Sequence, residues 1–289
     1  MSSPLRDDSS ALEPCSHEEA DTRMFIHVAD ATLNGLQRVI LRSNDSDVVI
    51  IAIACVQDLN LDELWIAYGL GTLRYIPAHM IARQLGPEKS RALLAFHAIT
   101  GCDTVSSIYY KGKRTAWDLW QSFPEMTTAF QHLSTFPQSI EDFGTMSMIE
   151  EFVARLYGSS LDVKTVNESR MHLFYNKAKD FVNMPPTKDA LIQHSLRAAY
   201  QAGHVWGQAL ITCPNLPDPS SWGWYKNGNS WDPVWTTLPP ISKNLREHVS
   251  VRKPANHLAN VVLLMLSAAP CVIVKEIALE ILDYKCFLR

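Results

Sequence analysis

Residues 38–54 read RVILRSNDSDVVIIAIA, and the rest of the chain has to fold around this stretch. The run 38–43 is short and rich in branched residues, which is typical of a β-strand. After the polar turn at residues 44–47, residues 48–54 are too apolar to face water on any side. We therefore predict a strand followed by a second buried element. We interpret this second element as a helix, and its periodicity leaves a strand open.

The chain before this stretch predicts a helix. Apolar residues recur at intervals of three and four between residues 16 and 34, which is typical of a helix with one buried face. Ser16 and Glu19 form an S-x-x-E capping-box pattern. We therefore expect the helix to begin at Ser16.

The chain after this stretch alternates between strand and helix patterns. Residues 64–68 and 73–76 are two strand-like runs joined through glycines, which by composition predicts a hairpin. Helices are predicted at 77–85, where proline suits the first turn, and at 88–99. This alternation predicts an α/β domain with a mainly parallel sheet, and ligands of such sheets bind at the carboxyl ends of the strands.

Acidic residues gather in three short motifs, HEEADTR, RSNDSDVVI and ITGCDT, near the ends of predicted elements. The five candidates are Glu19, Asp21, Asp45, Asp47 and Asp103. Taken singly, each acid could simply cap a helix, because Asp readily accepts hydrogen bonds from the first amides. Several carboxylates at one place repel one another and need a cation. Oxygen-only ligands suit Mg²⁺ or Mn²⁺, and a two-metal site suits phosphodiester cleavage.

One local basic patch follows the last acidic motif. Lys111, Gly112, Lys113 and Arg114 combine three cations with a glycine, directly after two tyrosines and before a predicted helix. These residues could hold a nucleic-acid backbone, helped by amides at the start of the helix. The alternative is a solvated helix face.

The remaining chain is divided by composition. We predict a disordered tail at 1–15, a helical region at 124–210 and an irregular segment at 211–255 that is rich in proline and tryptophan. The tryptophans offer either a stacking surface or a clamp that holds this segment on the helical part. Residues 256–289 form an apolar tail that is interrupted by polar residues and proline, so no membrane anchor is expected.

Composition narrows the class of protein. The chain has 289 residues, 47% of them hydrophobic, which is enough for a substantial core. A net charge of −4 provides no general attraction to nucleic acid, so any such binding depends on local patches. Six cysteines without a CxxC pair, together with a polar start to the chain, predict reduced thiols and a nuclear or cytoplasmic location.

In order and approximate spacing, the three acidic motifs resemble those of the flap endonuclease group of structure-specific 5′-nucleases, within the PIN-like fold. The likeness covers residues 16–123 and includes the run from Tyr75 through Asp103 to Leu119, which is similar to that family's approach to its helix-three-turn-helix. It implies a partial PIN-like nuclease core, a three-layer α/β/α architecture whose sheet is mainly parallel.

The resemblance also implies a role for each candidate. Asp45, Asp47 and Asp103 would bind one metal ion, while Glu19 and Asp21 would form half the shell of a second. The basic turn at residues 111–114 would hold DNA, with RNA as a second candidate. In the family, two further acids and the first strands precede the Glu19 motif, so we expect those strands to be missing here. Tyr110 also stands where the family's turn has its first glycine.

Two functions follow. The first is Mg²⁺-dependent hydrolysis of DNA phosphodiester bonds, impaired by the missing N-terminal acids. The second is a catalytically inactive relic that binds nucleic acid or a protein partner. Residues 194–200 and 204–207 are similar to uncharacterised eukaryotic reading frames that are often associated with transposons. This similarity indicates no particular activity.

Overall fold

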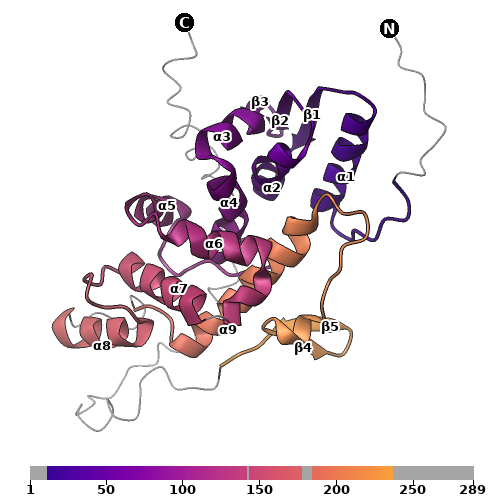
Figure 1. Ribbon diagram of the computed structural model, residues 1–289. Coiled ribbons are helices and arrows are strands. Elements are labelled where there is room, and N and C mark those ends of the chain that lie inside the picture. The colour runs from indigo at the N-terminus through magenta and orange to yellow at the C-terminus, as the bar shows by residue number, and fades with distance from the viewer. Residues whose placement is uncertain (1–11, 142, 178–183, 237–289) are drawn as a thin grey trace, which may run out of the picture.

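The structure is a computed structural model that describes residues 12–141, 143–177 and 184–236 (Figure 1). The described chain is a mixed α/β protein in which helices predominate. Its main helices are α1 (Ala20–Leu33), α2 (Ser46–Cys55), α3 (Ala78–Leu85), α4 (Pro87–Ile99), α5 (Lys113–Ser122), α6 (Met126–Thr135), α7 (Phe143–Leu156), α8 (Val166–Lys177) and α9 (Lys188–Ala199). Its strands are β1 (Arg38–Ser43), β2 (Glu63–Tyr68), β3 (Arg74–Pro77), β4 (Trp224–Asn227) and β5 (Ser230–Pro233).

The larger sheet contains three strands in the order β1-β2-β3. β1 and β2 run parallel, with Ile40 beside Trp65, whereas β2 and β3 form the predicted antiparallel hairpin. The prediction of a mainly parallel sheet was wrong for the described residues, because the short connection from β2 turns the chain straight back, and only an antiparallel neighbour can follow such a turn.

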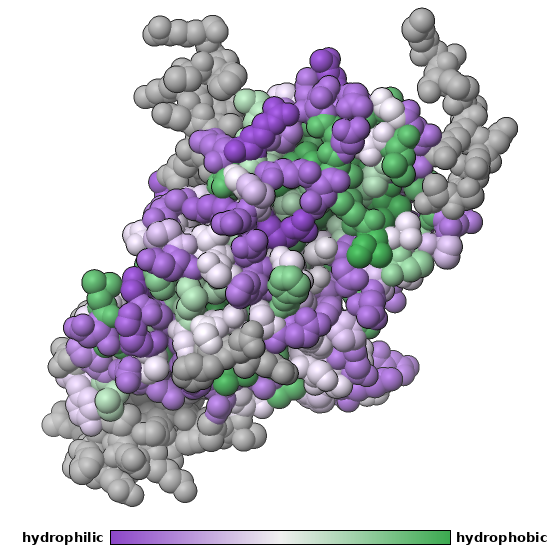
Figure 2. Space-filling view, viewed as in Figure 1, coloured by the Kyte–Doolittle hydropathy of each residue, from purple (hydrophilic) through white to green (hydrophobic). Residues whose placement is uncertain are grey.

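β1 is an edge strand of this sheet and is covered on one face only. Val39 and Leu41 pack against the core, whereas Ile40 on the opposite face is 62% exposed. Figure 2 shows apolar surface gathered on the part of the molecule where β1 and α1 lie, and Leu33 and Leu36 are also exposed there. The described helices therefore leave this face of β1 open.

α2 confirms that residues 48–54 form a helix. Every residue from Asp47 to Cys55 is buried, so the helix has no solvent face. Its first turn follows directly from the end of β1, and Asp45 occupies the N-cap position. The stretch that opens the sequence thus builds a strand, a tight polar turn and a fully enclosed helix, with α4 among the elements that pack on it.

The predicted start of the first helix was wrong. α1 begins at Ala20, and Glu19 is its N-cap without a side-chain capping bond. Residues before it are held by a distant part of the chain instead: the Ser16 amide donates to Thr212 O at 3.0 Å. The His17 ring contacts Ile211 O at 2.6 Å and Thr22 Oγ1 at 2.8 Å. These tertiary bonds outweigh the local capping pattern.

The helical half is continuous with the α/β half. α4 is buried along most of its length and packs on both α2 and α6. Phe96 from α4 stacks on Trp120 of α5 at a ring-centroid distance of 5.0 Å and meets Phe130 of α6 edge-on at 5.8 Å. A single hydrophobic core therefore crosses residue 123, where the sequence predicted the end of one unit.

The predicted helix at 189–208 changes its winding twice. α9 ends at Ala199 and continues as a π-helical segment, Tyr200–Val205, and then as one 3-10 turn, Trp206–Gln208. Figure 1 shows this orange element running up toward the β1–α2 region. It links the helical half to the segment before α1.

The proline- and tryptophan-rich segment is more regular than predicted where it is described. β4 and β5 form an antiparallel hairpin, and Trp222 just before it is buried against His204 at a ring-centroid distance of 4.6 Å. Arg197 donates to Gly223 O at 3.0 Å. The clamp interpretation is confirmed for Trp222. Residues 1–11 of the predicted disordered tail, residues 237–255 and the apolar tail 256–289 lie outside the described residues.

Within the described ranges, no helix combines the length and the apolar character needed to cross a bilayer. The four cysteines of these ranges, Cys15, Cys55, Cys102 and Cys213, carry free thiols.

Candidate acidic site

The three acidic motifs come from three different places in the fold. Glu19 and Asp21 lie at the start of α1, while Asp45 and Asp47 lie where β1 ends and α2 begins. Asp103 lies in the loop after α4. Only Asp45 and Asp47 therefore follow a strand, as predicted, whereas the other acids are placed by helix ends.

The three motifs lie close enough for their charges to interact. Burial, together with the charges of Asp45, Asp47 and Asp103, raises the pKa of Asp21 to about 6. Burial is the larger cause. Glu19 feels the charges of Asp21, Asp47 and Asp103. The five predicted acids are therefore electrostatic neighbours, although they are far apart in the chain.

Four of the five carboxyls have a raised pKa. Burial comes first among the causes for Glu19, Asp47 and Asp103, as it does for Asp21. The charges of Asp47 and Asp45 add to the effect on Asp103. A raised pKa means that the site favours the protonated acid over bare negative charge. The same preference would be met by a bound cation, which neutralises the carboxylates without protonating them.

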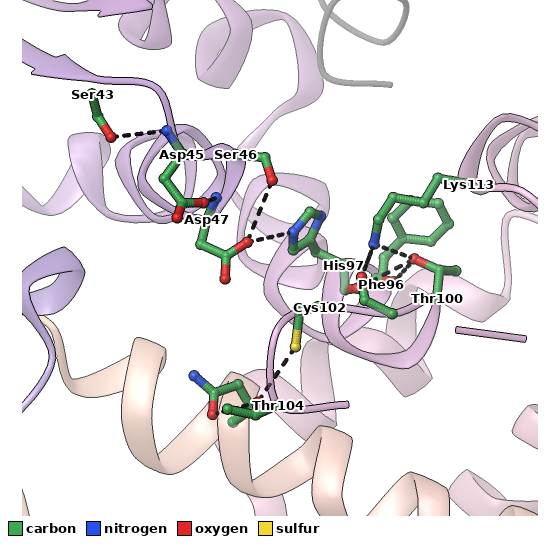
Figure 3. Close-up of polar contacts among 12 residues, drawn as sticks. Ser43, Asp45, Ser46, Asp47, Phe96, His97, Thr100, Cys102, Thr104 and Lys113 are labelled. Carbon is green, nitrogen blue, oxygen red and sulfur yellow. Dashed lines mark hydrogen bonds and ion pairs between the residues drawn. The ribbon is translucent and has the colours of Figure 1, made fainter. Parts of the chain in front are cut away.

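Asp47 is held by a histidine that the sequence did not single out. His97, on the buried face of α4, places Nε2 at 2.8 Å from Asp47 Oδ1 (Figure 3). Burial and the charge of Lys113 keep the pKa of His97 well below its usual value. The imidazole is thus neutral, and its contact with Oδ1 fixes the orientation of the Asp47 side chain.

Asp45 has a local role that can be separated from any ligand role. Its Oδ1 accepts from the Asp47 amide at 2.9 Å, which caps α2, and its own amide donates to Ser43 Oγ at 3.0 Å. Helix capping and metal binding, the two roles predicted for these acids, are therefore both open to Asp45. Capping occupies one carboxylate oxygen and leaves the second with acceptor capacity for a ligand.

The donor chemistry of the site fits Mg²⁺ or Mn²⁺, because all five side chains offer hard carboxylate oxygens. Among the described residues, no group of three or more His, Cys, Asp and Glu side chains is drawn together closely enough to hold a metal ion. The carboxylates thus share one neighbourhood without forming a closed cage. Binding of an ion would require the side chains to turn inward from their present positions.

The basic turn is placed beside the acidic site, and one of its cations is already engaged. The Lys113 ammonium, at the start of α5, donates to His97 O at 2.7 Å, Thr100 Oγ1 at 2.9 Å and Gly101 O at 2.5 Å. It thereby joins the start of α5 to the last turn of α4 (Figure 3). Lys113 is placed as an anchor for the loop that carries Asp103.

The other members of the turn lie closer to solvent. Arg114 and Gly112 are exposed, while Lys111 Nζ lies 4.8 Å from the centroid of the Tyr157 ring. Tyr110 is exposed and adopts a left-handed backbone with φ of 55°, a conformation that usually needs glycine. Tyr110, at the position where the resemblance to 5′-nucleases predicts a glycine, therefore has a left-handed backbone.

Comparison with protein families, with curated proteins and with solved structures finds no match to this chain. The resemblance to 5′-nucleases therefore stays a prediction based on three short motifs. The chemistry of the acidic site has to be argued from its own residues.

Proposed function

We propose that this protein is a metal-dependent nuclease that hydrolyses phosphodiester bonds of DNA at the acidic site, on a PIN-like variant of the α/β fold. One observation supports the proposal above all: three segments that are distant in the chain place five carboxylates close enough for their charges to interact, and four of these carboxyls have a raised pKa, chiefly because they are partly buried. Burying acids near one another costs stability, so the arrangement favours a cation-binding role.

In this proposal each residue has a limited task. Asp45, Asp47 and Asp103 bind one Mg²⁺ or Mn²⁺ ion, and Glu19 and Asp21 bind a second ion or orient the attacking water. When bound, such an ion lowers the pKa of a water and offsets charge on the leaving oxygen. His97 keeps Asp47 in position, and Lys111 and Arg114 contact the DNA backbone outside the acidic site. DNA as the partner agrees with the predicted nuclear or cytoplasmic location.

A second candidate function is a catalytically inactive module that binds nucleic acid or protein. Two contacts favour it: Asp47 is already paired with His97, and Lys113 is committed to the end of α4. Both contacts reduce what the site can offer to an ion or a phosphate. In this case the acidic neighbourhood would be a remnant, and binding would depend on the exposed part of the basic turn.

A cleavage assay with a matched control separates the two functions. The purified chain is incubated with a labelled flap or nicked duplex and Mg²⁺, beside Asp45→Asn/Asp47→Asn and beside Asp118→Asn, an exposed acid on α5. The nuclease proposal expects cleavage by the wild type and by Asp118→Asn, and loss of cleavage in the double variant. Cleavage that survives Asp45→Asn/Asp47→Asn would show that the activity belongs to another site or to a contaminant.

The inactive module gives a different result. No cleavage would occur, but the chain would bind the duplex in a salt-dependent manner, because phosphate contacts release counterions. Binding should then weaken in Lys111→Gln/Arg114→Gln and stay unchanged in Asp45→Asn/Asp47→Asn. Absence of both cleavage and binding would argue against both functions.

A further inference from the structure

A glutamine from the C-terminal half of the described chain reaches the acidic site. Thr104, next to Asp103, donates its hydroxyl to Gln201 Oε1 at 2.9 Å. The Gln201 amide nitrogen, Nε2, in turn donates to Glu19 Oε2 at 3.5 Å, a long hydrogen bond. One buried side chain thus touches the Asp103 loop on one side and the start of α1 on the other.

The direction of the Gln201 amide is set by its two partners. A carboxylate can only accept, so the NH₂ group has to face Glu19, and the Thr104 hydroxyl then donates to the opposite oxygen. A glutamate at this position would place a further negative charge against Glu19. Glutamine is therefore suited to joining an acid and a hydroxyl without adding charge to a site that is already repulsive.

The backbone that carries Gln201 is placed by close helix packing. Residues Tyr200–Val205 are π-helical, a rare winding that is common at functional sites. Within this segment, a Cβ on Gly203 would meet Leu133 O at 2.7 Å and Pro137 Cγ at 2.6 Å. A Cβ on Gly207 would meet Ser134 O at 2.9 Å. Because neither glycine has a side chain, this part of the chain can lie directly against the end of α6. This close packing fixes the position of the backbone that carries Gln201.

Three further contacts hold the chain before and after Gln201. His194 Nε2 donates to Ile99 O at the end of α4 at 2.8 Å, and its Nδ1 lies 3.4 Å from Ser106 Oγ. After Gln201, His17 contacts Ile211 O. The chain is thus held before and after Gln201, which places the Gln201 backbone between the end of α4 and the start of α1.

We propose that Gln201 is a positioning residue of the acidic site, which holds the Glu19 carboxylate and the Asp103 loop at a fixed separation. The inference deepens the proposed function and rests on it in one respect, since it takes the positioned carboxylates to be metal ligands. Gln201 itself does not touch the reacting atoms in this role. It acts through Glu19 and Thr104, as outer residues of metal sites commonly do.

A Mn²⁺ titration followed by electron paramagnetic resonance tests the role in metal binding. The variant is Gln201→Met, which keeps the length of the side chain and removes both hydrogen bonds. The matched control is Gln208→Met, whose amide bonds His204 O and Asn215 O, away from the acids. We expect Gln201→Met to weaken Mn²⁺ binding by about tenfold, the lower end for lost outer-shell partners. Gln208→Met should bind as the wild type does.

A second measurement needs no metal. Urea unfolding of Gln201→Met, Thr104→Val and the double variant forms a double-mutant cycle in the metal-free protein. Because both single changes break the same hydrogen bond, the double variant should lose less stability than the sum of the two. The same cycle with Gln208→Met in place of Gln201→Met should be additive.

The outcomes separate this inference from the proposed function. A wild type that binds no Mn²⁺ counts against the proposed function, and the cycle then decides alone whether Gln201 is coupled to the Asp103 loop through Thr104. A wild type that binds Mn²⁺ while Gln201→Met binds it equally well overturns the positioning role and leaves the proposed function intact. An additive cycle between Gln201 and Thr104 overturns the inference whatever the metal result.

Discussion

Asp45 has two possible roles, as a helix cap and as a metal ligand, and substitution can separate them. It caps α2 through the Asp47 amide, and its charge acts on Asp21. We predict that Asp45→Asn keeps the stability of the wild type, since asparagine caps a helix as well as aspartate, whereas Asp45→Ala loses about 1 kcal/mol. Both variants should lose Mn²⁺ binding to a similar extent.

Urea unfolding and a Mn²⁺ titration on the same three proteins check this prediction. If Asp45→Asn binds Mn²⁺ like the wild type, Asp45 is a cap and not a ligand. If Asp45→Asn is destabilised as strongly as Asp45→Ala, the charge matters to the fold beyond the cap.

The pKa of Asp21 predicts how stability depends on pH. This pKa lies at about 6 in the folded protein, against an ordinary value of 3.8, because of burial and the charges of three neighbouring acids. The folded state therefore holds the proton more tightly than the unfolded state. The resulting stabilisation is fully present below pH 3.8 and is lost as the pH rises through about 6.

Melting temperatures of the wild type and of Asp21→Asn between pH 4 and pH 7 measure this effect. We expect the wild type to lose stability relative to Asp21→Asn as the pH rises, because asparagine carries no charge. At pH 7, adding Mg²⁺ should restore part of the loss in the wild type. A difference between the two proteins that stays constant over this range would contradict the assignment.

The five acids of the candidate site could be selected from the sequence because they lie in three short motifs near the ends of predicted elements, but the contacts of these acids could not be predicted. His97 left only a weak signal, as a polar residue in the apolar second half of the α4 sequence. Gln201 left none, because its role comes from a contact between residues 104 and 201 that no local pattern records.

At the scale of elements, the close approach of the π-helical segment to α6 makes Gly203 hard to replace. We predict that Gly203→Ala costs about 1–3 kcal/mol, as overpacking in a core commonly does, because backbone atoms of α6 would have to move. Gly144→Ala is the matched control: Gly144 lies exposed in α7, and a Cβ there meets nothing. It should be neutral or stabilising by less than about 1 kcal/mol.

Urea unfolding measures both variants, and Mn²⁺ binding then tells whether the packing matters to the site. Gly203→Ala should also weaken Mn²⁺ binding, since it pushes Gln201 away from Glu19. A Gly203→Ala protein that is as stable as the wild type would show that the segment can shift freely, which contradicts its role as a fixed support.

Local patterns predicted the elements well where local forces decide them. The strand at 38–43, the hairpin and the helix at 88–99 all follow from runs and turns a few residues long. The start of α1 was misplaced because His17 and Ser16 bond to residues 211–212. The hairpin β4–β5 was missed because each strand has only four residues, one of them ends in proline, and the apolar residues show little alternation.

At the scale of the whole molecule, the described elements share one hydrophobic core, so we expect them to unfold together. α4 is enclosed by α2 on one side and by α6 and the π-helical segment on others. We predict that a fragment of residues 12–123 does not fold, because it would expose the apolar faces of α4 and α5. A fragment of residues 12–236 should fold.

Circular dichroism and the dispersion of amide signals in nuclear magnetic resonance compare the two fragments. The shorter one should show little fixed tertiary structure and should aggregate, as exposed apolar surface promotes. A shorter fragment with a sharp unfolding transition would support the predicted boundary at residue 123 and would weaken the view of a single core.

The general α/β class was predictable from the sequence, but the balance between parallel and antiparallel strand pairs was not. Alternating patterns before residue 100 suggested a mainly parallel sheet, yet the structure has one parallel and one antiparallel pair among its three main strands. Strand order depends on which segments meet in space, and neither hydrophobic period nor turn composition specifies that.

The enclosed helix α2 has a consequence for how the protein is made. A helix with no polar side leaves the ribosome early, long before the segments that will cover the acidic site and the far end of α4. At a synthesis rate of about 5–20 residues per second, the roughly 150 residues from α2 to Gln201 take on the order of ten to thirty seconds to appear. During that interval the apolar residues 48–54 of the nascent chain are exposed to solvent. We therefore expect chaperones to bind this segment during synthesis.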